Sequence, residues 1–186
     1  GCGTGELACD LARLGYRAVG VDFAPEMIAL AREKAANEKV DVEFTVASVF
    51  DYRAPPASVD LIAANGFIEY ITPEQLKQFF ALVGTWLAPG GVLVVGSRNR
   101  LFNAFSLNAY TRMELEAGTI PALIEEATAL ASAPDATSAL YLLRQQREPL
   151  PLMAQHPETG IKVATRHQYT PGELARLGIA AGLEPS

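Results

Sequence analysis

The sequence has little cysteine, few basic residues and no long apolar run. Cys2 and Cys9 are the only cysteines among 186 residues and do not form a CxxC pair. We therefore expect neither a disulfide framework nor a zinc site, and a cytoplasmic protein. Lys and Arg number 15 against 21 Asp and Glu, and the net charge of −6 argues against a nucleic-acid backbone as the main partner. No apolar segment reaches the length of a membrane span.

A glycine-rich segment opens the chain and is the most informative feature present. Gly1-Cys2-Gly3-Thr4-Gly5 precedes a helical pattern, and a short apolar segment then ends in Asp22. Glycines let a ligand approach bare backbone, and an acid at a strand end hydrogen-bonds ribose hydroxyls. The spacing is GxGxG, with Glu6 where a dinucleotide fingerprint has its third glycine. This spacing favours S-adenosylmethionine over a nicotinamide cofactor.

Strand and helix patterns alternate after the glycine segment. We expect helices at residues 6–14, 25–36 and 73–87, and strands at 18–22, 42–46, 60–64 and 92–96. The inward side chains of the second helix are expected to be Met27, Ile28, Leu30 and Ala31, and residues 60–64 are expected to form a buried strand. Residues 89–91, Pro-Gly-Gly, read as a turn. The alternation predicts an α/β fold with a doubly wound, Rossmann-like, mostly parallel sheet.

The chain is expected to divide into three parts. Residues 1–98 form the cofactor-binding core, residues 99–166 an inserted lid of helices and loops, and residues 167–186 return to the core. Residues 113–147 read as helical with an interruption near Pro134, residues 148–165 as a Pro-rich loop, and residues 172–182 as a helix capped by Thr170. Because the glycine segment lacks a preceding strand, we expect the complete fold to include a strand before residue 1 and further strands after residue 186.

Four motifs in order carry a resemblance to a known family. They are GCGTG at residue 1, GVDFAPEMI at residue 20, NGFIEYI at residue 65 and LAPGGVLVV at residue 87. In this order they resemble the class I S-adenosylmethionine-dependent methyltransferases, in the small-molecule branch that includes the ubiquinone-biosynthesis O-methyltransferases. The resemblance covers residues 1–98 well and 168–186 moderately. It implies a methyltransferase that acts on a small-molecule acceptor, with oxygen as the expected nucleophile.

The resemblance also implies which residues bind the cofactor. Its methionine part is expected along the glycine segment, its ribose at Asp22 and its adenine near the next strand end. The expected cofactor-binding residues are Gly1, Cys2, Gly3, Asp22, Phe23, Met27, Ser48, Val49, Phe50 and Asn65. Ser48 stands where the family usually has an Asp that reaches the adenine amino group, so this contact is weakened or passes to Asp51. Met27 and Phe23 fit packing roles as well as contacts to adenine.

The catalytic candidates are Glu69, His156 and His167. Transfer of a methyl group from a sulfonium needs mainly alignment, and a base assists when the acceptor is a phenol or alcohol. Arg98, Arg100 and Arg112 suit an anionic acceptor, and equally suit ion pairs with the Glu residues at 114, 116, 125 and 126. No metal site is expected, because Asn65 ends the strand where metal-dependent catechol methyltransferases place an acid.

Two other functions stay open on the sequence alone. A nicotinamide-dependent reductase shares the glycine–helix–acid logic, but no tyrosine has a lysine four residues on. A non-catalytic nucleoside-binding module would keep the glycine segment and Asp22 without an acceptor site. The unusual Ser48 and the segment Arg98-Asn99-Arg100-Leu101-Phe102-Asn103, which matches no pattern, leave room for this second alternative.

Overall fold

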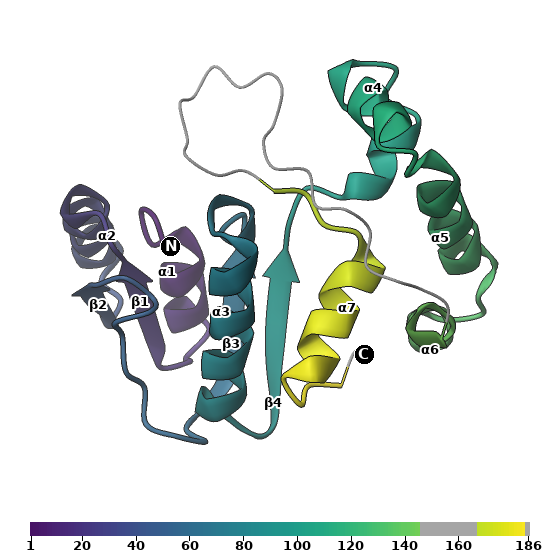
Figure 1. Cartoon of the computed structure of the whole chain (residues 1–186). Helices are drawn as coiled ribbons and strands as arrows, with labels where there is room; N and C mark the ends of the chain where they lie inside the picture. Colours follow the sequence, from purple (N-terminus) through teal and green to yellow (C-terminus); the bar gives the residue numbers. More distant parts are fainter. Residues whose placement is uncertain (146–166, 185–186) are drawn as a thin grey trace. The chain divides into compact units, whose positions relative to one another are not determined.

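A computed structural model describes residues 1–145 and 167–184, and the chain divides into two compact units. Unit 1 is Gly1–Ser58 and unit 2 is Val59–Ser186. Each unit holds one two-stranded parallel sheet with helices packed on it (Figure 1). The prediction of an α/β fold with parallel strands is therefore confirmed, and each unit is described by itself below.

Unit 1 follows the predicted order of elements. Helix α1 spans Glu6–Arg13, strand β1 Ala18–Asp22, helix α2 Pro25–Glu38 and strand β2 Val42–Val46. Strands β1 and β2 pair in register from Ala18 opposite Val42 to Asp22 opposite Val46. Pro25 opens α2 at its first position, where a missing N–H costs nothing. The local patterns were sufficient to predict all four elements.

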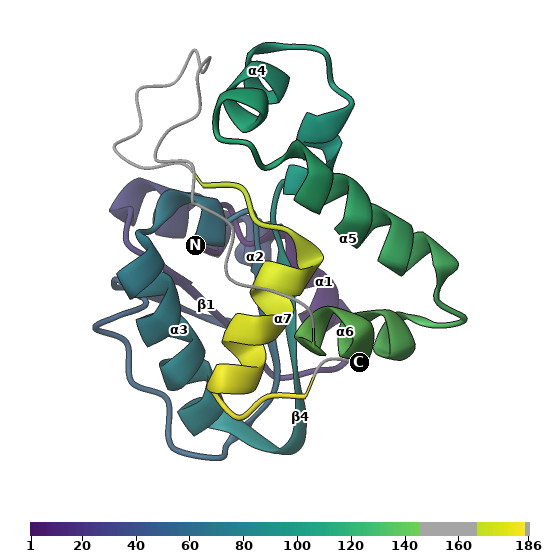
Figure 2. The same ribbon diagram turned by 45° about the vertical axis from the view of Figure 1, so that its right-hand side comes forward.

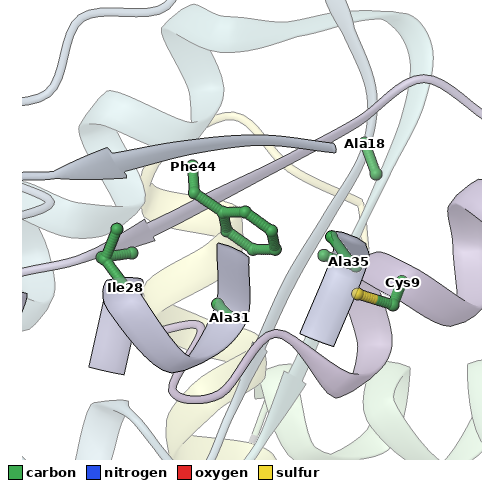
Figure 3. Packing of buried hydrophobic residues seen from close by; sticks show 7 residues of the cluster. Cys9, Ala18, Ile28, Ala31, Ala35 and Phe44 are labelled. Carbon is green, nitrogen blue, oxygen red and sulfur yellow. The ribbon is translucent and has the colours of Figure 1, made fainter. Parts of the chain in front are cut away.

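A small hydrophobic core holds unit 1 together. Its buried members come from both helices and both strands, and Figure 3 shows the Phe44 ring over α2 among smaller side chains. They are Ala8, Cys9, Ala18, Ile28, Ala31, Ala35 and Phe44. A Cβ at Gly20 would come within 2.6 Å of the Phe44 ring, so only glycine lets β1 lie this close to it.

The predicted inward face of α2 is wrong at two of its four positions. Ile28 and Ala31 are fully buried, whereas Met27 is 39% and Leu30 48% exposed. The buried stripe is Ile28–Ala31–Ala35, spaced three and four residues apart. Since successive helical residues are about 100° apart around the axis, Met27 and Leu30 lie at the sides of this stripe.

Unit 2 is built on strands β3 (Val59–Asn65) and β4 (Leu87–Gly96). Helix α3 (Pro73–Trp86) connects the two strands, and the later helix α7 (Pro171–Ala180) packs against α3. The apolar residues at helical spacing along α3 are buried, as is Leu87 directly after the helix: Leu76, Phe79, Phe80 and Val83. Small residues allow the helix contact, because a Cβ on Gly84 would come within 3.0 Å of the Ala181 carbonyl.

The predicted turn at Pro89-Gly90-Gly91 lies inside β4. Val59 pairs with Leu87 and Leu61 with Val92, so β4 accommodates extra residues as an irregularity of the ladder. Gly90 has φ 80°, a value that glycine adopts without strain. The Pro-Gly-Gly signal therefore marks a register shift within a strand and does not separate helix from strand.

The expectation that residues 60–64 form a buried strand is wrong. Leu61 is 44% exposed, and on β4 Val92 and Val94 are 48% and 46% exposed. Their alternate neighbours, such as Ile62 and Leu93, are only partly exposed. Side chains alternate between a packed face and an open face of this sheet. An apolar composition therefore did not mean that both faces of the strand are buried.

The segment after β4 is mainly helical. It contains a 3₁₀ turn, η2 (Arg100–Ala104), and helices α4 (Ala109–Glu116), α5 (Ile120–Ser132) and α6 (Ala136–Gln145). The predicted interruption near Pro134 separates α5 from α6. Helices α4 and α5 contact η2, and α6 contacts α7, beside which it lies in Figure 2. The loop predicted at 148–165 lies outside the described residues. No helix in residues 1–145 and 167–184 is long and apolar enough to cross a lipid bilayer.

Candidate functional site

The glycine segment forms a turn that is fixed on β1. The Cys2 amide donates to the Val21 carbonyl at 2.9 Å, and the Gly5 amide donates to the Cys2 carbonyl at 3.1 Å. Gly3 and Gly5 have φ values of 55° and 77°. A Cβ on Gly5 would come within 2.8 Å of the Phe44 ring, while one on Gly3 would meet nothing within 4 Å. The segment is thus packed on one side and open at Gly3.

Asp22 ends β1 and is held by backbone amides. Its side chain accepts from the Gly3 amide at 2.9 Å on Oδ2 and from the Ala24 amide at 3.0 Å on Oδ1. The residue is only 5% exposed. An ionised carboxylate has about four lone-pair positions, and two amides leave room for further donors. The carboxylate is therefore oriented in advance at the place where the sequence predicts a ribose.

The neighbours of Asp22 differ in their accessibility. Phe23 is 76% exposed and Met27 39% exposed, so both side chains present apolar surface next to β1. Gly1 is exposed and Cys2 half-buried. Burial is the largest influence on the Cys2 thiol and raises its pKa, and the Asp22 carboxylate adds to this upward shift. Cys2 therefore behaves as a packing residue and not as a nucleophile.

A tight turn follows β2 beside Asp22. The Ala47 amide donates to the Asp22 carbonyl at 2.9 Å. The Ser48 hydroxyl accepts from the Phe50 amide at 3.3 Å, and the Ser48 carbonyl accepts from the Asp51 amide at 3.0 Å. Val49 and Phe50 are half-buried on this turn, and Asp51 is exposed. Unit 1 therefore contains nine of the ten predicted cofactor residues, which lie in the glycine segment, just at or after the ends of β1 and β2 and, for Met27, in the first turn of α2.

The tenth residue, Asn65, ends β3 in unit 2. Gly66 follows with φ 66°, and its amide donates to the Gly96 carbonyl at 2.9 Å. A Cβ on Gly96 would lie 2.8 Å from the Asn65 Oδ1, so the amide side chain occupies the space over Gly96. Asn65 is thus placed at the carboxyl end of its sheet, where ligands of parallel α/β sheets bind.

Two of the three catalytic candidates meet in unit 2. Glu69 lies in a 3₁₀ turn, η1 (Ile68–Tyr70), and its carbonyl accepts from the His167 amide at 2.8 Å. The two residues are 6% and 5% exposed. The Glu69 carboxylate also lies 3.5 Å from the Arg98 Nε. His156 lies outside the described residues. Glu69 and His167, which are 98 positions apart in the chain, are therefore neighbours in the fold, as residues of one site must be.

The unexplained segment after β4 contains a buried ion pair. Arg100 is 1% exposed and makes a two-point contact with Glu114, with Nε–Oε1 at 2.8 Å and Nη2–Oε2 at 2.9 Å. Its Nη1 reaches Glu173 on α7 at 3.1 Å. Of the two interpretations of these arginines, pairing with glutamates is the correct one for Arg100.

Further hydrogen bonds extend this pair into a network between η2, α4, α5 and α7. The Asn103 amide donates to Glu114 at 3.0 Å, and Thr119 also donates to that carboxylate. Glu126 accepts from the Thr170 hydroxyl at 2.9 Å and from the Gly172 amide at 2.7 Å. We call these residues, with Arg100 and Glu173, the buried polar network.

The two carboxyls that contact Arg100 are shifted in opposite directions. Burial raises the pKa of Glu114, but hydrogen bonds from Arg100, Thr119 and Asn103 outweigh it, so the net shift is downward. At Glu173 burial prevails over the Thr170 amide and Arg100, and the Glu126 carboxylate adds to it, so the pKa is raised. Glu114 is therefore the firm anionic partner of Arg100.

The sequence offered the Arg100–Glu114 pair as one of two interpretations, but it indicated neither the rest of the buried polar network nor Tyr169. Tyr169 is 2% exposed and forms a parallel bridge with Asn99. Its contacts join residues about 70 positions apart, so no local periodicity could have indicated them. The nearby features that the sequence offered were His167 and the capping signal at Thr170.

Comparisons with known proteins show what the chain is similar to in sequence and fold. Residues 1–91 match a family model described as a methyltransferase domain. A ubiquinone biosynthesis O-methyltransferase from Xanthomonas campestris is 36% identical over 108 residues, which are 58% of this chain and 44% of that protein. A second ubiquinone biosynthesis O-methyltransferase, from Methylocella silvestris, is 29% identical, and 41% of its length is covered. The chain therefore spans less than half the length of these curated relatives.

Solved structures agree on the fold. A S-adenosylmethionine-dependent methyltransferase from Methanosarcina mazei has a TM-score of 0.67 at 21% identity, over 97% of this chain and 76% of that one. At this identity the likeness concerns the fold alone. Together with the domain match, it shows that residues 1–91 are similar to a methyltransferase domain and that the chain has the fold of S-adenosylmethionine-dependent methyltransferases.

Proposed function

We propose that the protein binds S-adenosylmethionine and transfers its methyl group to a small-molecule acceptor, with oxygen as the nucleophile. The observation that carries the proposal is the Asp22 carboxylate, which is buried and held by the Gly3 and Ala24 amides beside an open Gly3. The named relatives methylate oxygen in ubiquinone biosynthesis. Their acceptor is not assigned to this protein, because the match covers only 44% of the relative.

The residues present fit the cofactor. Asp22 keeps acceptor capacity for ribose hydroxyls, Phe23 offers an exposed ring for adenine, and the turn at Ser48–Phe50 lies beside them. The open space at Gly3 leaves room for the methionine part of the cofactor. The sulfonium of the cofactor supplies an activated methyl group. Binding and orientation are the tasks left to these side chains.

Glu69 and His167 are proposed to receive the acceptor proton. As the acceptor oxygen forms its bond to the methyl carbon, the carbon–sulfur bond breaks and the sulfur keeps the electron pair. The proton of the hydroxyl passes to a base, and Glu69 and His167 are buried and adjacent. Residues 99–166 are proposed to form the lid over this acceptor region, since η2, α4, α5 and α6 follow β4 directly.

The proposal is tested first by calorimetric titration of S-adenosylhomocysteine into the full-length protein, with NADH as the matched ligand. We expect micromolar binding of S-adenosylhomocysteine and none of NADH. The reverse result would identify a nicotinamide-dependent reductase. Binding of S-adenosylhomocysteine without turnover of phenols, alcohols or amines would indicate a non-catalytic module.

Glu69→Gln and His167→Gln test the proton acceptor. We expect at least one of them to lower kcat about a hundredfold, as the loss of a positioned base does, while the Kd for S-adenosylhomocysteine stays the same. The measurement is steady-state methyl transfer to the best acceptor of the panel. Glu116→Gln, at an exposed position of α4, is the control. Unchanged kcat in both variants would remove the two residues from the chemistry.

A further inference from the structure

Tyr169 carries a buried hydroxyl that lacks a partner. The residue is 2% exposed, and its hydroxyl oxygen has no hydrogen-bond partner in the part of the chain that the structure describes. Most buried polar side-chain atoms are hydrogen-bonded to protein or to ordered water. An unpaired buried hydroxyl is therefore a position where a bound molecule gains a contact that the free protein does not make.

The backbone around Tyr169 is fixed. Its carbonyl accepts from the Arg100 amide at 3.1 Å, and it forms the parallel bridge with Asn99 just after β4. Arg100 itself is anchored in the buried polar network. The backbone that carries the Tyr169 side chain is therefore fixed at this position.

Tyr169 also lies next to the proposed proton acceptors. Its ring centroid is 6.1 Å from that of His167, and the His167 amide donates to the Glu69 carbonyl. These three residues form one cluster at the carboxyl ends of β3 and β4. A molecule that delivers its proton to Glu69 or His167 thus comes within reach of the Tyr169 side chain.

We infer that the Tyr169 hydroxyl donates a hydrogen bond to an oxygen of the methyl acceptor and positions it beside Glu69 and His167. The inference rests on the proposed function and names a positioning residue within it. Burial raises the pKa of Tyr169 to about 12, with Glu173 and Glu74 adding to the shift, so its hydroxyl keeps its proton at neutral pH and can donate a hydrogen bond. The partner of this donor is an oxygen with an available lone pair.

The same surroundings define the charge of the acceptor. Glu173 uses one carboxylate oxygen for Arg100 and the other for the Thr170 amide. Its charge and that of Glu74 act on Tyr169, and they would repel an anionic group bound there. The acceptor class that fits is a neutral phenol with a second oxygen, such as a carbonyl, that accepts from Tyr169.

Three probes separate these features: 3-hydroxybenzaldehyde has a neutral carbonyl, 3-ethylphenol lacks it, and 3-hydroxybenzoate is an anion. We expect kcat/KM of the full-length protein to be about tenfold higher for the aldehyde than for either of the others. In Tyr169→Phe the preference of the aldehyde over 3-ethylphenol should disappear. The Kd for S-adenosylhomocysteine should stay unchanged, and the Tm without acceptor should not fall.

Tyr141→Phe, at a tyrosine 57% exposed on α6, is the matched control and should keep the preference. An unchanged ratio in Tyr169→Phe would overturn the inference, as would a lowered Tm, which would give the hydroxyl a structural partner. A protein that binds S-adenosylhomocysteine and methylates none of the phenols would also overturn it. Failure to bind S-adenosylhomocysteine would instead overturn the proposed function itself.

Discussion

Arg100→Met is expected to lower the free energy of unfolding of unit 2 by about 3–5 kcal/mol, because it leaves buried carboxylates without their cation. Glu114 is fully buried and receives two of its hydrogen bonds from Arg100. Breaking a buried pair from one side costs more than the pair itself is worth. The measurement is urea unfolding followed by the fluorescence of Trp86, the only tryptophan, which lies in α3 of unit 2.

Two further variants make this result specific. Arg112→Met removes an arginine at an exposed position of α4 and should change the free energy of unfolding by less than about 0.5 kcal/mol. The double variant Arg100→Met, Glu114→Met should lose less than the sum of its single variants, because the uncompensated carboxylate is gone. Equal losses for Arg100→Met and Arg112→Met would show that the buried polar network contributes nothing to stability.

The sequence was informative where structure is local. The glycine segment, the acid at the end of β1 and the alternation of strands and helices all depend on residues a few positions apart, and the structure has these elements where they were predicted. The cap at Thr170 is likewise local, since its hydroxyl accepts from the Glu173 amide. Such signals arise from backbone geometry and short-range hydrogen bonds, which a single sequence displays directly.

Long-range contacts are where prediction from the sequence ended. Arg100 and Glu173 are 73 residues apart, and nothing in either neighbourhood indicates the other. The choice between an anion-binding and an ion-paired Arg100 therefore needed the structure. Met27 shows a different limit, because its apolar character predicted burial while the geometry of α2 places it 39% exposed. The apolar character of a side chain favours its burial, but the packing of the helix determines which apolar side chains are actually buried.

Asp22→Ala is expected to weaken S-adenosylhomocysteine binding by about 2–5 kcal/mol, roughly thirtyfold to several thousandfold in Kd, because a desolvated charged partner is lost. The carboxylate does two things: it offers acceptors for ribose, and it fixes the Gly3 and Ala24 amides. Asp22→Asn keeps one carbonyl acceptor and should lose less affinity than Asp22→Ala. Calorimetric titration of both variants separates the two contributions.

Asp41→Ala is the matched control, since Asp41 is exposed in the same unit and should leave the Kd unchanged. Thermal unfolding of each variant shows whether unit 1 stays folded, because Asp22 also holds the glycine segment. If Asp22→Ala stays folded and binds within threefold of the parent protein, Asp22 is not the ribose acceptor. Asp22→Asn can accept from only one of the Gly3 and Ala24 amides, because its NH2 group is a donor. If Asp22→Asn loses as much affinity as Asp22→Ala, both carboxylate oxygens are needed for binding. If Asp22→Asn retains most of the affinity, one acceptor oxygen at this position is sufficient and the negative charge is not required.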